Sequence, residues 1–457
     1  MAQVDLLMEA IVFGIRIDMI LSGLRPAVLI HEFRKKVGPP SSETLPPRVS
    51  QGLRAYWMDG AFSSLSDNLA INFFEIFLIS LGGGNREVGA MASIGNLLGF
   101  ISLVPGVAAV RLLGRRKPVV VIFGGGIGRL MYVMLAFVPF LFPSPSVAIP
   151  AVIAFNGIRI FMGNFSNPAW TAMTADLVPE SIRGSYFASR GAIVAILGSI
   201  AAFSAGWIVT WGNRVPGRPY FGFTILFAAT FVFGMIATWF FSRVPDIDGD
   251  IKRKGRPLGD LLRGLLGYPE FIGFLAFSFL WNFALYVSGP FFNVYMVRDL
   301  GTSAGMIGMV STIGTVVQIF ALPYWGRMID RRGNLRVLTI CGFIIPLLPL
   351  AWMLTTRSWE PLIVNAFGGF VWAGFNLANF NLLLKMIPES DRQEGAALYQ
   401  SLVLLSMVLG PLVGAEIVEA WGYKLSFAFS GVFRYVALAV LYALVLRKLR
   451  TSVPRGT

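Results

Sequence analysis

Apolar runs of about 20 residues recur along this chain at intervals of roughly 30 residues, and each run is long enough to cross a bilayer as a helix. The composition agrees, because 55% of the residues are hydrophobic and only 14% are charged. A soluble protein of this length needs more charge to cover its surface. The sequence therefore predicts an all-α membrane protein with twelve transmembrane helices, at 55–81, 87–110, 118–141, 147–171, 185–211, 219–242, 269–297, 304–326, 335–356, 361–386, 394–420 and 424–446.

Two sets of residues occur once in each half of the chain, at nearly the same spacing. The first set is Leu81-Gly82, Gly89 and Ile94-Gly95, which returns 219 positions later as Leu300-Gly301, Gly308 and Ile313-Gly314. The second set is Asn156, Asn167, Pro179-Glu180-Ser181 and Arg183, which returns 209 positions later as Asn365, Asn376, Pro388-Glu389-Ser390 and Arg392. A duplicated apolar unit predicts two pseudo-symmetric six-helix bundles, over 53–242 and 269–447, that enclose a site near the bilayer midplane.

Polar segments flank and separate these bundles. Residues 1–52 combine an apolar but charged stretch, which favours a cytoplasmic amphipathic helix on the membrane surface over a further span, with a proline-rich linker. Residues 243–268 form the longest polar connection between spans and mark the domain boundary as a cytoplasmic linker. Residues 448–457 form a short cytoplasmic tail.

The net charge of +14 is distributed unevenly over the two sides of the membrane. Most of the 38 Lys and Arg residues lie in the termini and in the loops that follow even-numbered spans. The opposite side carries only Arg86, Arg214, Arg218, Arg298, Arg357 and Lys424. This asymmetry predicts a multi-pass protein of the cell membrane with both termini in the cytoplasm. It also explains the basic charge through contact with the lipid bilayer, so nucleic acid is not an expected partner.

Several kinds of chemistry have no residues to support them. The single cysteine, Cys341, excludes an intramolecular disulfide, and the single histidine, His31, lies outside the predicted spans. The absence of a Gly-Lys dipeptide removes the phosphate-binding loop that many nucleotide-dependent proteins use. We therefore expect no metal, no cofactor and no catalytic residue, and the chain is not expected to be an enzyme.

One motif resembles a known family. The loop after the eighth span reads Gly326-Arg327-Met328-Ile329-Asp330-Arg331-Arg332-Gly333, similar to the Gly-x-x-x-Asp-Arg-x-Gly signature of the major facilitator superfamily. With twelve spans and a long central loop, the chain resembles that superfamily over about 53–447. The resemblance implies the major facilitator fold, and it implies that Gly326, Asp330, Arg331 and Gly333 belong to a cytoplasmic gate. The alternative is that these residues only cap helices and orient the chain.

The equivalent loop of the first half, 110–117, departs from the signature. Arg111 stands where the family has its acidic residue. We therefore expect an asymmetric gate that depends more on Asp330 than on the first-half loop.

A second resemblance lies in the fourth span. Arg159 and Gly163 are similar to the Arg-x-x-x-Gly core of a motif found in proton-coupled antiporters of the superfamily. Asp67, in the first span, lies at a similar expected depth, and an arginine at membrane depth needs a partner or water. Asp67 and Arg159 thus form a candidate proton-coupling pair, or alternatively a permanent ion pair that fixes helix packing. Glu75 is either a second acidic site or a residue of the outer vestibule.

Polar and aromatic residues follow single faces of several predicted spans, and Gly289-Pro290 predicts a break in the seventh span. The candidates for a substrate cavity are Asn68, Asn72, Asn156, Asn167, Trp281, Asn282, Tyr286, Trp372, Asn376 and Asn379. For each amide the alternative is a bond between helices. Many aromatics and few charges favour an amphiphilic or weakly polar organic solute. Two further intramembrane arginines, Arg129 and Arg434, are expected to have structural roles, either bonded between helices or extended toward the membrane surface.

The function implied by the resemblance is secondary active transport of a small organic solute by alternating access, with protons as an open second partner. The expected oligomeric state is a monomer. Span 5 lacks the proline of the antiporter pattern near Gly198 and Gly206, so the direction of coupling stays open. The alternatives are an uncoupled facilitator, a flippase for lipid-like molecules, or a membrane sensor that does not transport.

Overall fold

The computed structural model describes residues 46–179, 182–246, 268–386 and 392–446, and the regular structure within these ranges is entirely helical. The predicted N-terminal amphipathic helix, most of the 243–268 linker and the C-terminal tail lie outside the described residues. So do Glu180-Ser181 and Pro388-Glu389-Ser390, which belong to the second repeated set.

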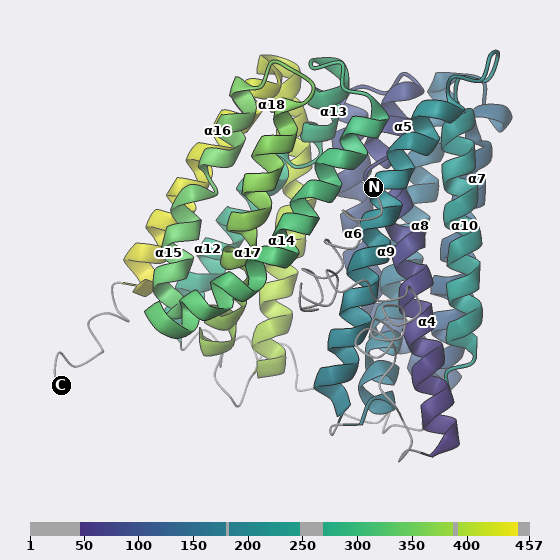
Figure 1. Ribbon diagram of the computed structural model, residues 1–457, viewed down its shortest axis with the longest axis horizontal. Helices are drawn as coiled ribbons and strands as arrows, with labels where there is room; N and C mark the ends of the chain where they lie inside the picture. Colours follow the sequence, from purple (N-terminus) through teal and green to yellow (C-terminus); the bar gives the residue numbers. More distant parts are fainter. Residues whose placement is uncertain (1–45, 180–181, 247–267, 387–391, 447–457) are drawn as a thin grey trace, which may run out of the picture.

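The helices form two bundles that lie side by side (Figure 1). The N bundle contains α4 (Pro47–Ala70), α5 (Phe74–Ser80), α6 (Asn85–Leu113), the π-helix η1 (Val119–Gly128), α7 (Arg129–Leu141), α8 (Pro145–Leu177), α9 (Arg183–Gly212) and α10 (Phe221–Ser242). The C bundle contains α12 (Pro269–Ser288), α13 (Phe291–Arg298), α14 (Ala304–Arg332), α15 (Asn334–Ile344), α16 (Leu347–Leu354), α17 (Glu360–Met386), α18 (Arg392–Leu441) and the π-helix η4 (Tyr442–Leu446).

These helices account for the twelve predicted spans, and the prediction of an all-α membrane protein is confirmed. Ten stretches of the described chain are long and apolar enough to cross a membrane. One of them, Leu398–Val445, contains two predicted spans, because Gly422 interrupts α18 with a non-helical φ of 82°. The first predicted span, α4 with α5, is not among the ten, and its sequence is rich in polar residues.

The first and seventh spans break at equivalent positions. The seventh span is divided at Gly289-Pro290, as predicted, because a proline inside a helix removes a hydrogen-bond donor and clashes with the preceding turn. The first span is divided at 71–73, between α4 and α5, without a proline. Each span therefore ends in a short helix, α5 or α13, at the same end of the molecule (Figure 1).

The repeated glycines lie where the bundles meet at this end. Gly82 and Gly301 have φ angles of 96° and 58°, in the left-handed region that favours glycine, and each forms the turn before the next helix. A Cβ at Gly89 of α6 would lie 2.7 Å from the carbonyl oxygen of Pro411 in the C bundle. A Cβ at Gly308 of α14 would lie 2.7 Å from the carbonyl oxygen of Ala202 in the N bundle. The repeat is thus a pair of backbone-to-backbone contacts between the bundles.

Polar contacts surround these glycine contacts, which seal this end of the molecule. Arg86 forms an ion pair with Glu416 at 3.0 Å, and Arg298 donates to the carbonyl oxygen of Gly83 at 2.6 Å. Both members of the ion pair are largely exposed, so water screens it and the glycine packing contributes more to closure. Toward the opposite end, where the α14–α15 turn lies, the bundles diverge (Figure 1). We call the sealed end the α5–α13 end.

Close packing of helices within each bundle also depends on glycines, which have no side chain, and a substitution can test this. A Cβ at Gly106 of α6 would lie 2.1 Å from the carbonyl oxygen of Phe165 in α8, and backbone cannot move aside cheaply. We expect Gly106→Ala to lower the free energy of unfolding by about 1–3 kcal/mol. The measurement is thermal unfolding of purified protein in detergent.

The matched control is Gly191→Ala in α9, because nothing lies within 4 Å of its added Cβ. This control should be neutral or slightly stabilising, since alanine favours helix. Equal destabilisation by both variants would contradict the packing of α6 against α8.

Candidate functional site

Three cavities lie between the sealed end and the divergent end of the bundles. The N cavity, of about 470 Å³, is enclosed by helices of the N bundle. The interface cavity, of about 370 Å³, is lined by α4, the break that follows it and α9 on one side, and by α14 on the other. The C cavity, of about 410 Å³, lies within the C bundle. Asn68 lines both the N and interface cavities, while Ser311 and Thr315 line both the interface and C cavities, so the three adjoin one another.

The N cavity contains an ion pair that the sequence analysis missed. Arg190 of α9 lies 3.5 Å from the carboxylate of Asp59 in α4, and its guanidinium lies over the ring of Tyr56 at 4.2 Å from the centroid. Its Nε also donates to the Tyr56 carbonyl oxygen at 3.2 Å. A signal was present, because both charges lie within five residues of the start of predicted spans that enter from the same side.

Arg129 joins helices and also faces the N cavity. Its guanidinium donates to the hydroxyl groups of Ser66 and Ser63 in α4, at 3.0 and 2.9 Å. These bonds agree with the predicted interhelical role. The same side chain lines the N cavity, which the sequence analysis did not expect.

Asp67 and Arg159 line the same cavity but do not pair. Arg159 donates to Asn156 Oδ1 at 2.9 and 3.1 Å and to the Tyr132 hydroxyl at 3.4 Å, and its guanidinium lies over the ring of Phe74. Within the described part of the chain, no ion pair of up to 4.0 Å joins it to Asp67, whose side chain is exposed. The alternative of a permanent Asp67–Arg159 ion pair is therefore wrong for this state. Neutral and aromatic neighbours hold the arginine instead.

Glu75 lies in the contact between the bundles. It is on α5, interacts with the side chain of Asn293 on α13, and its Oε2 is buried without a hydrogen-bond partner. The alternative that Glu75 faces an open outer vestibule does not fit this state, because the α5–α13 end is sealed.

Half of the predicted cavity residues do line the cavities. They are Asn68, Asn72, Asn167, Trp372 and Asn376. Asn68 and Asn72 reach the interface cavity from the N bundle, and Trp372 and Asn376 reach the C cavity from α17.

The other half are engaged in packing and are not among the residues that line these three cavities. Asn156 accepts from Arg159, and Asn282 donates to the Ser278 carbonyl oxygen. Asn379 donates to the Tyr399 hydroxyl. The aromatic members, Trp281 and Tyr286, pack against Phe375 and Gly410 respectively.

The signature loop lies far from the seal, at the divergent end. Gly333 ends α14 with a φ of 84°, while Asp330 and Arg331 are exposed. Nothing lies within 4 Å of a Cβ added at Gly326. Among the described residues, Asp330 has no ion pair, whereas the first-half loop is tied to α8 by an ion pair between Arg116 and Asp176. The gate role of Asp330 remains a prediction for a state in which this end is closed.

Comparisons with known proteins agree with this architecture. The family model described as "Major Facilitator Superfamily" matches residues 60–295 and 282–456, one match for each bundle. The solved inward-facing, occupied structure of a bacterial homolog of the human lysosomal transporter Spinster has a TM-score of 0.67 at 13% identity. That likeness covers 90% of this chain and all of the other, and it shows the fold alone.

Two curated relatives are also similar to the chain. The multi-drug resistance efflux pump PmrA of Streptococcus pneumoniae is 25% identical over 413 residues, which cover 85% of this chain and 96% of the relative. An Na⁺, Li⁺, K⁺/H⁺ antiporter of Planococcus maritimus is 25% identical over 175 residues, which cover 37% of this chain and 39% of the relative.

The two acids of the N cavity should differ in their effect on stability. Asp59→Asn leaves the buried guanidinium of Arg190 without its carboxylate, so we expect the free energy of unfolding to fall by about 3–5 kcal/mol. Asp67→Asn removes an exposed, unpaired carboxylate and should change it by less than about 1 kcal/mol. Thermal unfolding in detergent measures both, and equal shifts would contradict the assignment of the pair.

Proposed function

Because the chain belongs to the Major Facilitator Superfamily, we propose that this membrane protein is a secondary active transporter of a small, amphiphilic organic solute. The observation that carries the proposal is the set of adjoining polar cavities at mid-depth, closed at one end by glycine contacts between the bundles. Alternating access requires that this seal opens while the other end closes around the solute. The site residues proposed from the sequence serve this route, with Asn68, Asn72, Asn167, Trp372 and Asn376 in contact with the solute.

We propose the orientation of the chain from its charge. The basic segments at the ends of α6 and α14, with Arg111 and Arg331, lie at the opposite ends of these helices from α5 and α13, and so at the divergent end. By the positive-inside rule we propose that this end, and both termini, lie in the cytoplasm. In this orientation the structure is open toward the cytoplasm and sealed on the outer side.

The size and lining of the cavities support an amphiphilic solute. Cavities of about 410 and 470 Å³ fall within the roughly 300–1,000 Å³ typical of small-molecule sites. Aromatic rings such as Trp352 and Trp372 alternate with amides in the C cavity. The name of the Streptococcus relative, an efflux pump for multiple drugs, supports export of such compounds.

Proton coupling is a separate part of the proposal. Asp67 has no ion-pair partner among the described residues and lines the N cavity together with Arg129 and Arg159, so it is the carboxylate that we propose for proton coupling. The name of the Planococcus relative, an antiporter that uses H⁺, supports exchange for protons. The alternatives are an uncoupled facilitator and a lipid flippase, and the following experiment separates them from proton-coupled transport.

The coupling test uses protein in liposomes with an imposed pH gradient. A thermal-shift screen over amphiphilic solutes first selects the transported probe. We expect the gradient to drive probe flux in wild type, and Asp67→Asn to abolish the dependence on the gradient. Asp246→Asn, an exposed carboxylate at the end of α10, is the matched control and should behave as wild type. Flux that ignores both the gradient and Asp67→Asn would remove coupling while leaving transport.

The alternating-access test locks the sealed end. In a Cys341→Ala background, the pair Arg86→Cys and Glu416→Cys is joined by a short methanethiosulfonate cross-linker that reductant can cleave. Because these positions lie on opposite bundles beside the glycine seal, the cross-link should stop flux and reductant should restore it. Each single-cysteine variant, treated identically, is the control. Full flux through cross-linked protein would contradict opening at this end.

A further inference from the structure

Arg434 is a buried cation without a charged partner. It lies on α18 after the break at Gly422, and only 2% of the residue is exposed. Its Nη2 donates to Ser430 Oγ at 2.9 Å, and its Nε has no hydrogen-bond partner. Among the described residues, no carboxylate pairs with it. An arginine stays charged in a protein, so its burial has a cost that no partner offsets.

A purely structural role does not explain this arrangement. Ser430 precedes Arg434 by one turn of the same helix, so their hydrogen bond does not join two helices. Arg129, by contrast, donates to two serines of a neighbouring helix. The described contacts of Arg434 therefore leave donors of its guanidinium available to something else.

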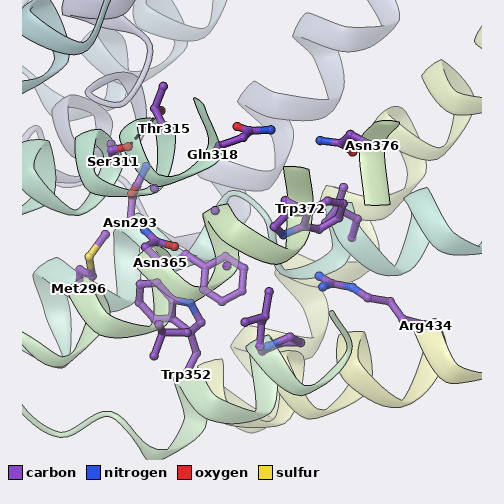
Figure 2. A pocket seen from close by; sticks show the side chains of 18 residues that line it. Asn293, Met296, Ser311, Thr315, Gln318, Trp352, Asn365, Trp372, Asn376 and Arg434 are labelled. Carbon is purple, nitrogen blue, oxygen red and sulfur yellow. Dashed lines mark hydrogen bonds between the residues drawn. The ribbon is translucent and has the colours of Figure 1, made fainter. Parts of the chain in front are cut away.

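The guanidinium opens onto the C cavity. Figure 2 shows Arg434 extending from its helix toward the space below Trp372, while the amides of Gln318 and Asn376 lie above Trp372 and that of Asn365 lies to its left; all of these residues line the C cavity. Arg434 is the one charged residue among those that line the cavity. Amide groups can donate further hydrogen bonds, and the rings of Trp352 and Trp372 provide apolar surface.

We propose that the C cavity is a binding site for an organic anion, with Arg434 as the residue that binds its carboxylate or a comparable acidic group. A planar guanidinium can form two parallel hydrogen bonds to a carboxylate, and in a buried site such charge-assisted bonds are strong. The aromatic rings would hold the apolar part of the same molecule. The ligand class is an amphiphile with one anionic group.

The N cavity, which adjoins the C cavity through the interface cavity, also has an excess of positive charge. Among the described residues that line them, the N cavity has three arginines, Arg129, Arg159 and Arg190, against two carboxylates, Asp59 and Asp67, and the interface cavity has no charged residue. The three adjoining cavities thus carry an excess of positive charge, which favours an anionic solute over a cationic one. As an assignment of the transported solute, this rests on the proposed function; as a binding site, it does not.

The experiment compares three probes of the same shape in uncharged detergent. They are 6-bromo-2-naphthoate, its neutral carboxamide, and the corresponding aminomethyl cation. Bromine quenches tryptophan fluorescence at short range, so Trp352 and Trp372 report occupancy of the C cavity. We expect wild type to bind the carboxylate at least about tenfold more tightly than the amide, a difference of about 1.4 kcal/mol. The cation should bind most weakly.

Variants assign the preference to Arg434. Arg434→Gln should abolish the preference for the carboxylate. Arg434→Lys should keep part of the preference, because lysine retains the positive charge but lacks the planar guanidinium that can donate two parallel hydrogen bonds. Arg357→Gln, at an exposed position outside the cavities, is the matched control and should keep it fully. A preference that survives Arg434→Gln, or no preference in wild type, overturns the proposal.

A second variant covers the case in which Arg434→Gln does not fold. Trp372→Phe keeps all charges and removes one of the two indoles that line the C cavity, so quenching by the bound carboxylate should fall while its preference over the carboxamide remains. Unchanged quenching would place the carboxylate elsewhere and overturn the proposal. If the protein does not transport the probe, the proposed transport function fails but the binding results still test the site. If the protein transports a cation and does not bind the carboxylate, the anion-site inference is overturned and the transport function stands.

Discussion

The structure depends on the close approach of the two bundles at Gly89 and Gly308. Each glycine lets a helix contact backbone carbonyl groups of the other bundle, where any side chain would clash. This approach brings α5 and α13 together and allows polar contacts such as Arg86–Glu416 to form at the edge. The cavities lie away from these contacts, and amides and hydroxyls are among the residues that line them. Closure at this end is therefore a consequence of the repeated glycines.

The intramembrane arginines divide by what surrounds them. Arg190 has a carboxylate, Arg129 has two hydroxyls of another helix, and Arg159 has an amide and aromatic rings. Arg434 has only a serine of its own helix among the described residues. Because burying a cation costs free energy unless a partner offsets it, this series runs from structural to ligand-dependent. The lack of a partner on another helix, rather than burial alone, identifies Arg434 as the candidate for recognition of a solute.

The spans, the break at Gly289-Pro290 and the two-bundle layout could be predicted because hydropathy and proline chemistry are local properties of the chain. Matching depths along the spans placed Asp67 and Arg159 in one cavity correctly. It could not show that they do not pair, because Asn156 and Tyr132 occupy the donors of the guanidinium. The same depth argument, applied to Asp59 and Arg190, would have found the ion pair that does form.

By itself the amino-acid sequence determined that this chain crosses a membrane as helices, that its two halves are copies, and that glycines recur at fixed places in both. Those features are set by apolar run length and by residue identity. Only the tertiary structure decided which polar residues face a cavity and which bond to a neighbouring helix, as the separation of Asn376 from Asn379 shows. The reason is that the direction of a side chain around a helix has meaning only once the neighbouring helices are in place.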